Sequence, residues 1–189
     1  KGTSITELAL SKKLAVIEDS AFENCTKLTT VTWHDHTLEK IGSAAFKGCT
    51  AVKGLTLTQE NTNDSSANTS AESAQIIELP DSVTVIGAEA FLGLKLPQKL
   101  IWSRCLTELG ANAFSGCTRI SVVRFADSEE VMHILEIPAS LEQCGVSPLT
   151  DADITSAVWE EGSDKILSNI VQGTGITSVE VPKTVLSIQ

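Results

Sequence analysis

The chain has 189 residues, of which 42% are hydrophobic and 20% are charged, a composition typical of a folded globular domain. Its formal net charge of −10 and the absence of any basic run exclude nucleic acids and anionic membrane surfaces as expected partners, since both attract clustered Lys and Arg. No apolar stretch of about 18 residues is present, so the sequence predicts no membrane insertion. No signal peptide is visible at Lys1.

A nine-residue segment recurs along the chain, with an apolar residue first, Ala-Phe at its fifth and sixth positions, and Cys or Leu last. The copies are 17–25, 41–49, 86–94 and 109–117, and their phenylalanines are 24, 45 and 23 residues apart. The period is therefore about 23 residues with one copy missing, which predicts a solenoid whose turns bury their apolar faces against each other. We expect each segment to form a short helical turn with its Ala, Phe and Cys in the core.

A second repeating element is a triplet with apolar first and third residues, the alternation of a short strand with one buried face. Seven of the eight spacings between consecutive triplets are 22 to 24 residues. The triplets are 8–10, 31–33, 55–57, 77–79, 100–102, 123–125, 135–137, 157–159 and 179–181.

Two segments interrupt this period. The polar segment 58–75 replaces one Phe-containing segment and is predicted to be a mobile loop, because it is too polar to be buried. The segment 126–134 lies in a step of 12 residues between triplets and is predicted to be a hairpin-like excursion or an insertion. Further along, Ile170 takes the Phe position of a degenerate repeat. No polar capping repeat precedes Gln189, so we expect further repeats or a covering subunit at this end.

Five cysteines are present, and three of them, Cys25, Cys49 and Cys117, share one repeat position. Equivalent side chains in neighbouring turns point in parallel about 4.8 Å apart, farther than the ~3.8 Å that disulfide Cβ atoms prefer. We therefore expect reduced thiols that pack as small hydrophobic groups.

The pattern Ile-Gly-x-x-Ala-Phe-x-x-Cys followed by Leu-x-x-Val-x-Leu-Pro resembles the BspA-like (Treponema-type) leucine-rich repeats, strongly over 8–57 and 77–125 and weakly over 126–189. The departures are the missing Phe segment and Leu94 and Gly173 at the Cys position. The resemblance implies one right-handed leucine-rich-repeat solenoid over 1–189, of about eight turns, with a parallel β-sheet on its concave face and short helical or 3-10 segments. It also implies a bacterial cell-surface or extracellular location, and adhesion to a host or microbial surface protein or glycan. It supplies no catalytic residue and no cofactor.

The binding residues expected from this architecture are the strand residues between the buried positions. Among them, Ile76, Ile101, Val122 and Val158 are expected to form an exposed apolar stripe, which is typical of a contact surface. Alternatively, β-branched residues are there because strands favour them. The predicted set is Thr30, Thr32, Thr56, Ile76, Glu78, Lys99, Ile101, Val122, Arg124, Glu136, Val158, Ser178 and Glu180.

Other residue clusters have simpler interpretations. Two histidines within 33–36 could hold Zn²⁺ or Cu²⁺, but a structural site needs four ligands, which favours a solvated turn. Acidic residues at 151–153 and 160–161 could collect Ca²⁺, yet they match no loop signature, which favours a solvated face. The tryptophans Trp33, Trp102 and Trp159 could form an aromatic binding platform, but they occupy the third triplet position, which favours the core.

Glycosylation sequons occur at Asn24, Asn63 and Asn68, and Asn24 is the poorest acceptor because it lies in a packed repeat segment. None of the three histidines lies in a Ser or Cys nucleophile motif, so no enzyme is predicted. The sequence thus favours a monomeric, non-enzymatic adhesion module without cofactor or metal. A passive spacer or stalk is the alternative.

Overall fold

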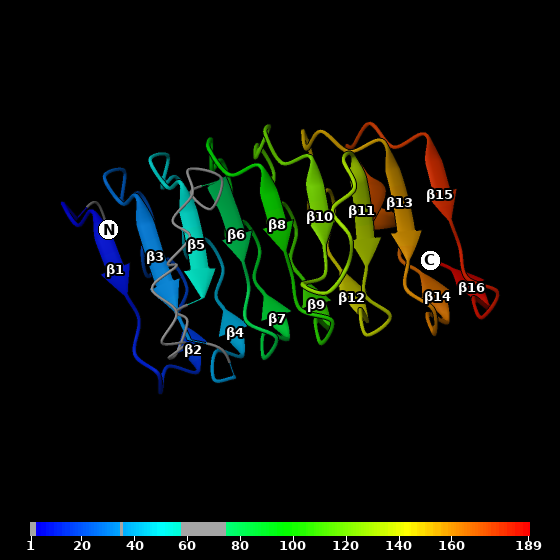
Figure 1. The fold of residues 1–189 in the computed structure, drawn as a ribbon, viewed down its shortest axis with the longest axis horizontal. Coiled ribbons are helices and arrows are strands. Elements are labelled where there is room, and N and C mark those ends of the chain that lie inside the picture. Colours follow the sequence, from blue (N-terminus) through cyan, green and yellow to red (C-terminus); the bar gives the residue numbers. More distant parts are fainter. Residues whose placement is uncertain (1–2, 35, 58–74) are drawn as a thin grey trace.

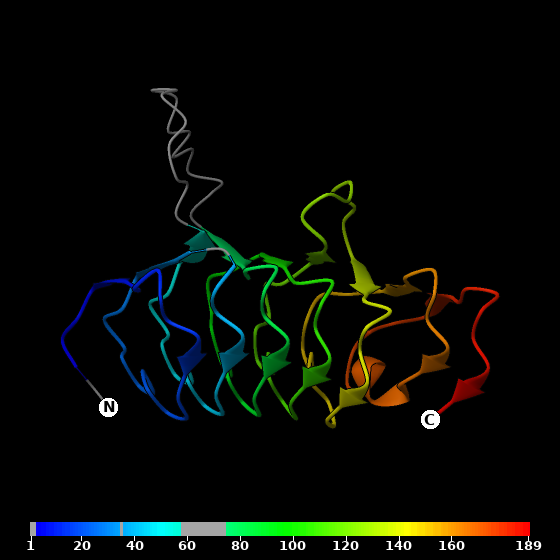
Figure 2. The same cartoon turned by 90° about the horizontal axis from the view of Figure 1, so that it is seen from below.

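The computed structural model describes residues 3–34, 36–57 and 75–189. The chain forms a parallel β-solenoid of about seven turns with almost no helix (Figures 1 and 2). The predicted loop 58–75, with Asn63 and Asn68, lies outside the described residues except for Gln75. Asp35 also lies outside them.

Two layers of parallel strands run along the solenoid, seen one above the other in Figure 2. The first layer is a 9-stranded sheet made of β1 (Glu7–Ala9), β3 (Thr30–Trp33), β5 (Gly54–Leu57), β6 (Ile76–Glu78), β8 (Lys99–Ile101), β10 (Val122–Arg124), β11 (Ile134–Ile137), β13 (Ser156–Trp159) and β15 (Ser178–Glu180). The second layer holds a 5-stranded sheet, β12 (Gln143–Cys144), β9 (Glu108–Leu109), β7 (Val85–Ile86), β4 (Lys40–Ile41) and β2 (Val16–Ile17), and a 2-stranded sheet, β14 (Lys165–Ile166) and β16 (Ser187–Ile188).

Each predicted triplet corresponds to one strand of the first sheet, so the strand prediction is confirmed. The first triplet residues are in register along the whole sheet, from Leu8 paired with Val31 at one end to Ala157 paired with Val179 at the other. Because side chains alternate along a strand, the first and third triplet residues face the interior and the middle residues face outward.

The two interruptions of the period are places where the described residues form no second-layer strand between consecutive strands of the first sheet. We call these the direct connections; one links β5 to β6 and the other links β10 to β11. The second layer closes over both, since β4 pairs with β7 and β9 pairs with β12. The first sheet therefore has more strands than the second layer, which explains why about seven turns form where about eight were expected.

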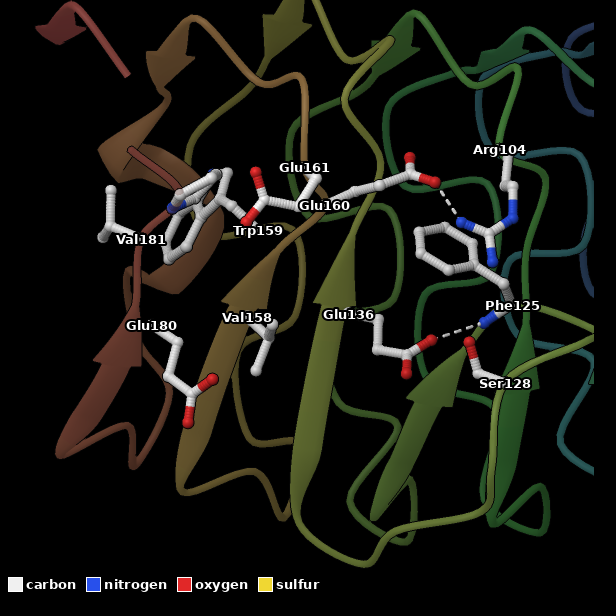
Figure 3. A pocket seen from close by; sticks show the side chains of 11 residues that line it. Arg104, Phe125, Ser128, Glu136, Val158, Trp159, Glu160, Glu161, Glu180 and Val181 are labelled. Atoms are coloured by element: carbon white, nitrogen blue, oxygen red, sulfur yellow. Dashed lines mark hydrogen bonds and ion pairs between the residues drawn. The ribbon is translucent and has the colours of Figure 1, made fainter. Parts of the chain in front are cut away.

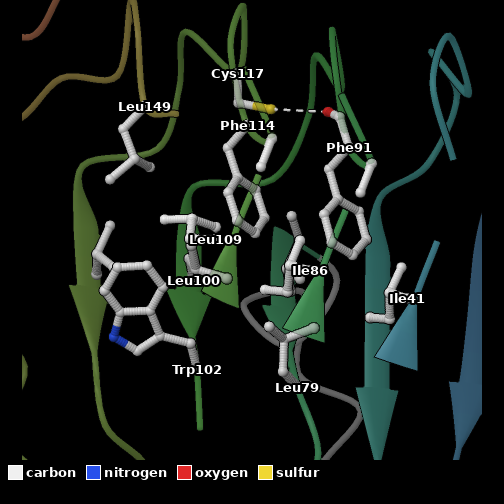
Figure 4. Packing of buried hydrophobic residues seen from close by; sticks show 14 of the residues in the cluster. Ile41, Leu79, Ile86, Phe91, Leu100, Trp102, Leu109, Phe114, Cys117 and Leu149 are labelled. Atoms are coloured by element: carbon white, nitrogen blue, oxygen red, sulfur yellow. Dashed lines mark hydrogen bonds between the residues drawn. The ribbon is translucent and has the colours of Figure 1, made fainter. Parts of the chain in front are cut away.

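A stack of phenylalanine rings forms the centre of the core. Phe46 and Phe91 are in contact although a copy of the motif is missing between them, with ring centroids 5.6 Å apart. Phe22 precedes them at 5.2 Å from Phe46, and Phe114 follows at 4.9 Å from Phe91. Buried Leu149 lies beyond Phe114 (Figure 4). The missing copy thus leaves no hole.

The Phe-containing segments are turns and not the short helical turns that were predicted, whereas a 3-10 segment does form near the C-terminus. Each segment holds a residue with positive φ before its Ala-Phe pair, such as Ala44 at 54°, and a second near its end, such as Gly48 at 72°. These angles interrupt a right-handed helix. The Phe46 N–H donates instead to Ala90 O of the next turn at 2.7 Å. Hydrogen bonds between turns thus alternate with bonds inside the segment, such as Lys47 N to Ala44 O at 3.2 Å.

The C-terminal turn contains a 3-10 helix, η2 (Ser168–Val171), in which Ile170 is fully buried at the predicted Phe position. In the last turn Val179, Leu186 and Ile188 are exposed. Among the residues that the structure describes, no helix is long and apolar enough to span a bilayer.

Candidate binding face

The predicted binding residues lie on the outward face of the 9-stranded sheet, in two rows. One row contains the middle triplet residues, including Thr32, Thr56, Glu78, Glu136 and Glu180. The second row contains the residues two positions earlier, Thr30, Ile76, Lys99, Val122 and Ser178. Register thus brings residues from distant repeats onto one continuous face, which we call the strand face.

The predicted exposed apolar stripe is interrupted, because Ile101 and Val122 are buried, with 6% and 1% of their surface exposed. This corrects the expectation that both face solvent. The direct connection after β10 rises from the strand face at this place (Figure 2). Ile76 and Val158 are partly exposed, so they alone remain of the stripe.

The segment 126–134, which we call the insertion, is fastened to the sheet by cationic side chains. The Arg124 Nη1 donates to Phe125 O, Ala126 O and Ser128 O at 2.7–3.1 Å. The Lys99 Nζ contacts Glu130 Oε2 at 2.9 Å. Two of the predicted ligand-binding residues, Arg124 and Lys99, therefore hold the insertion in place.

A third cation, Arg104, joins the insertion to the neighbouring strands. Its guanidinium donates to Asp127 Oδ1 at 2.6 Å and to Glu160 Oε1, and it lies 4.0 Å from the centre of the Phe125 ring. The hydrogen bond from Arg104 lowers the pKa of Asp127, so this pair stays ionised at neutral pH. The insertion is thus a preformed feature of the strand face.

The hydrogen-bond ladder of the first sheet opens beside the insertion. In an uninterrupted turn, the N–H of the third triplet residue donates to the middle residue of the next strand, as Leu79 N does to Ile101 O at 2.8 Å. Beside the insertion, Glu136 O accepts from Trp102 Nε1 at 3.0 Å, while Phe125 N donates to the Glu136 carboxylate at 2.9 Å. An indole and a carboxylate therefore provide hydrogen-bond partners for the backbone groups that have no backbone partner where the ladder opens.

The same arrangement is present at the other direct connection. Glu78 O accepts from Trp33 Nε1 at 2.7 Å, and Leu57 N is 3.5 Å from Glu78 Oε2. In both places the tryptophan comes from two strands before the glutamate. Both tryptophans are 1% exposed, so the prediction that they belong to the core is confirmed. Each indole also donates a hydrogen bond to a backbone carbonyl at the place where the ladder opens.

A groove of about 300 Å³ lies on the strand face across β11, β13 and β15 (Figure 3). Glu136, Val158 and Glu180 share one register position on these strands and line it side by side. Val181 adds exposed apolar surface, whereas Trp159 and Pro182 line the groove as mostly buried residues. Ser128 of the insertion lines its other side. The sequence predicted three of these residues individually, but their common groove depends on register.

The remaining candidates lie apart from each other. Asp153 is near His133, with Nδ1 to Oδ2 at 3.4 Å, whereas Glu160 bonds Arg104 and accepts from Ala139 N at 3.0 Å. Within the described ranges, no three His, Cys, Asp or Glu side chains form a group that could hold a metal ion. Asn24 is exposed with a φ of 58°.

All five cysteines are free, as predicted, and Cys25, Cys49 and Cys117 are buried. The Cys49 and Cys117 thiols donate to Phe22 O and Phe91 O at 3.0 and 3.3 Å. Burial raises the pKa of Cys49 to about 11 and that of Cys117 to about 12. These thiols are packing groups that hydrogen-bond to the preceding Phe-containing turn.

Comparison with known proteins identifies this solenoid. The family model described as the BspA type leucine rich repeat region matches in 6 copies, over residues 1–121 and 68–189. The chain belongs to the BspA-type leucine-rich repeat family. Leucine-rich repeat proteins of this kind are generally protein-binding modules. A search of curated proteins gives no match.

A search of solved structures finds leucine-rich repeat proteins. A leucine-rich repeat protein of Treponema pallidum is 19% identical with a TM-score of 0.67, and the alignment covers 97% of this chain and 72% of that protein. A leucine-rich cell surface protein of Faecalibacterium prausnitzii is 16% identical with a TM-score of 0.28, over 96% of this chain and 88% of that one. The Treponema structure shows that the two chains share the leucine-rich-repeat fold.

Proposed function

We propose that this chain is a non-enzymatic adhesion module at a bacterial cell surface, and that it binds a host or microbial surface protein or a glycan on its strand face. The observation that carries the proposal is the insertion, which Arg104, Arg124 and Lys99 hold in place beside a groove. Ordering this segment before binding lowers the conformational entropy that binding would cost. Membership of a family of binding modules supports the same role.

The strand face combines features expected of a protein contact surface. Partly exposed Thr32, Thr56, Ile76 and Val158 offer hydroxyl and apolar groups on a rigid sheet. Rigid strands keep these groups at fixed spacings, so a complementary partner can contact several repeats at once. The groove supplies a concave place for a side chain of that partner.

Binding of the purified chain to an array of matrix proteins and glycans tests the proposal. The informative variant is Val158→Arg, which places bulk and charge in the groove. Its matched control is Val16→Arg, on the outward side of β2 in the second layer, where Val16 is 37% exposed. Saturable binding that Val158→Arg abolishes and Val16→Arg retains is the expected result.

Equal loss of binding in both Val→Arg variants would contradict a role for the strand face. Failure of the parent chain to bind any partner on the array would favour the passive spacer. Circular dichroism of all three proteins checks that each variant remains folded.

A further inference from the structure

The groove between the insertion and β15 has a chemistry that selects one kind of ligand. We propose that it binds a lysine side chain of a basic protein segment. This inference rests on the proposed function, because it assigns a partner chemistry to the same strand face. The charges around the groove, their spacing and its apolar floor all favour such a ligand.

Negative charge dominates the lining of the groove. Four carboxylates, those of Glu136, Glu160, Glu161 and Glu180, line it together with one guanidinium, that of Arg104. Glu160 is paired with Arg104, and one oxygen of Glu136 accepts from Phe125 N. Within the described part of the chain, Glu161 and Glu180 are exposed and have no cationic partner.

The spacing of the carboxylates favours an organic cation over a metal ion. Glu136 and Glu180 flank Val158, two strands and therefore about 10 Å apart in the sheet. A hard cation such as Ca²⁺ needs six to eight oxygens around one point. No three acidic, His or Cys side chains of the described residues form such a group.

The apolar floor fits the stem of a long side chain. Val158 and Val181 lie between and beside the carboxylates (Figure 3), and Pro182 also lines the groove. Lysine covers apolar surface with its methylene groups while its ammonium group stays among polar ones. Its three donors can reach acceptors on separate strands, whereas a guanidinium prefers the two oxygens of one carboxylate.

A neutral sugar fits this groove less well. The two aromatic residues in its lining, Phe125 and Trp159, are 4% and 5% exposed, so their rings present little surface on which a sugar could stack. The net charge of −10 of the whole chain also attracts basic partners during encounter. Both observations favour a lysine-bearing protein segment.

Titration of the ¹⁵N-labelled chain with a Gly/Ser peptide that carries three lysines tests this proposal. We expect saturable amide shifts confined to β11, β13, β15 and residues 160–161. Acetylation of the lysine Nε atoms of the peptide should abolish the shifts. Glu180→Gln should weaken binding about fivefold, the effect of one exposed ion pair near the upper end of its usual range.

The control is Glu7→Gln, which makes the same change at an exposed, outward position of β1 on the same sheet. Peptide affinity unchanged by Glu7→Gln supports the proposal. Equal weakening by both variants, or shifts spread over the molecule, would show unspecific attraction and overturn it. The same shifts induced by CaCl₂ alone would assign the groove to a metal ion instead.

The outcome separates this inference from the proposed function. Array binding that Val158→Arg abolishes, together with no response to the lysine peptide, would overturn the lysine assignment and leave the adhesive role standing. A localised peptide response with no partner on the array would support the groove and contradict the adhesive role as tested.

Discussion

At the scale of single residues, the repeat positions separate packing roles from surface roles. The thiols of Cys49 and Cys117 are enclosed in the core and donate to carbonyls of a preceding turn. Cys105, outside the repeat position, is exposed. Since the thiolate is the reactive form, both burial and raised pKa protect the core thiols.

Alkylation of the native chain with iodoacetamide at pH 8 should therefore modify Cys105 first. Burial raises the pKa of Cys144 to about 12, so this partly buried thiol should react far more slowly. Peptide mass mapping against time measures the order. Modification of Cys49 or Cys117 at the rate of Cys105 would contradict the packing described here, and unfolding in guanidinium should make all five thiols reactive.

The indole of Trp102 is the second residue-scale case. Replacement Trp102→Phe removes the donor to Glu136 O and part of the buried volume, so we expect a loss of about 2–4 kcal/mol in the free energy of unfolding. Urea denaturation measures it. The control is Trp159→Phe. Trp159 holds the same triplet position, but the ladder beside it is not opened, since Val158 pairs with Glu180. Equal losses would show that Trp102 acts through volume alone.

At the scale of the repeat element, close approach between turns explains the Gly of the Ile-Gly motif. A Cβ atom on Gly87 would lie 2.5 Å from Ser43 N and 2.7 Å from Gly42 C in the preceding turn. Gly110 and Gly145 meet the backbone of their preceding turns in the same way. A missing side chain thus permits the spacing at which β4, β7, β9 and β12 pair.

Substitution Gly87→Ala should accordingly force two turns apart, at a cost of about 1–3 kcal/mol or more, because the clash is with backbone atoms that cannot rotate away. Thermal unfolding followed by circular dichroism measures this cost. Gly93→Ala is a comparison without such a clash, since nothing lies within 4 Å of its added Cβ, although its φ of +78° adds backbone strain. A Gly87→Ala variant as stable as the parent would refute the role of this approach.

At the scale of the whole molecule, stability is distributed along a continuous core in which each turn depends on its neighbours. Phe91 is stacked on both sides, by Phe46 and by Phe114, whereas Phe22 has one stacking partner and is half-buried. The direct connections leave this core intact because the second layer closes over them.

We expect Phe91→Ala to lower the free energy of unfolding by about 3–5 kcal/mol, the usual cost of emptying a Phe site in a core. Phe22→Ala, at the end of the stack, should cost clearly less, because its ring is already partly solvated. Denaturant unfolding of both variants gives the comparison. A larger loss for Phe22 than for Phe91 would contradict a core that depends on neighbours on both sides.

The sequence by itself determined the solenoid, the strand positions, the core roles of the tryptophans and the free thiols. Periodic burial explains this success: a residue that recurs every 22 to 24 positions in one chemical class must face the same environment in each turn. The period also revealed both interruptions, because a missing copy and a short step each break it.

Only the tertiary structure decided where the insertion goes and how the first sheet adapts at the two direct connections. Hydrogen bonds between turns, together with positive φ at residues such as Ala44, interrupt the short helical turns that the local pattern favoured. The burial of Ile101 and Val122 beside the insertion, the pairing of Trp102 with Glu136, and the groove at Val158 depend on contacts between strands far apart in sequence. Periodicity describes the environment that repeats share, whereas a site arises where neighbouring repeats differ.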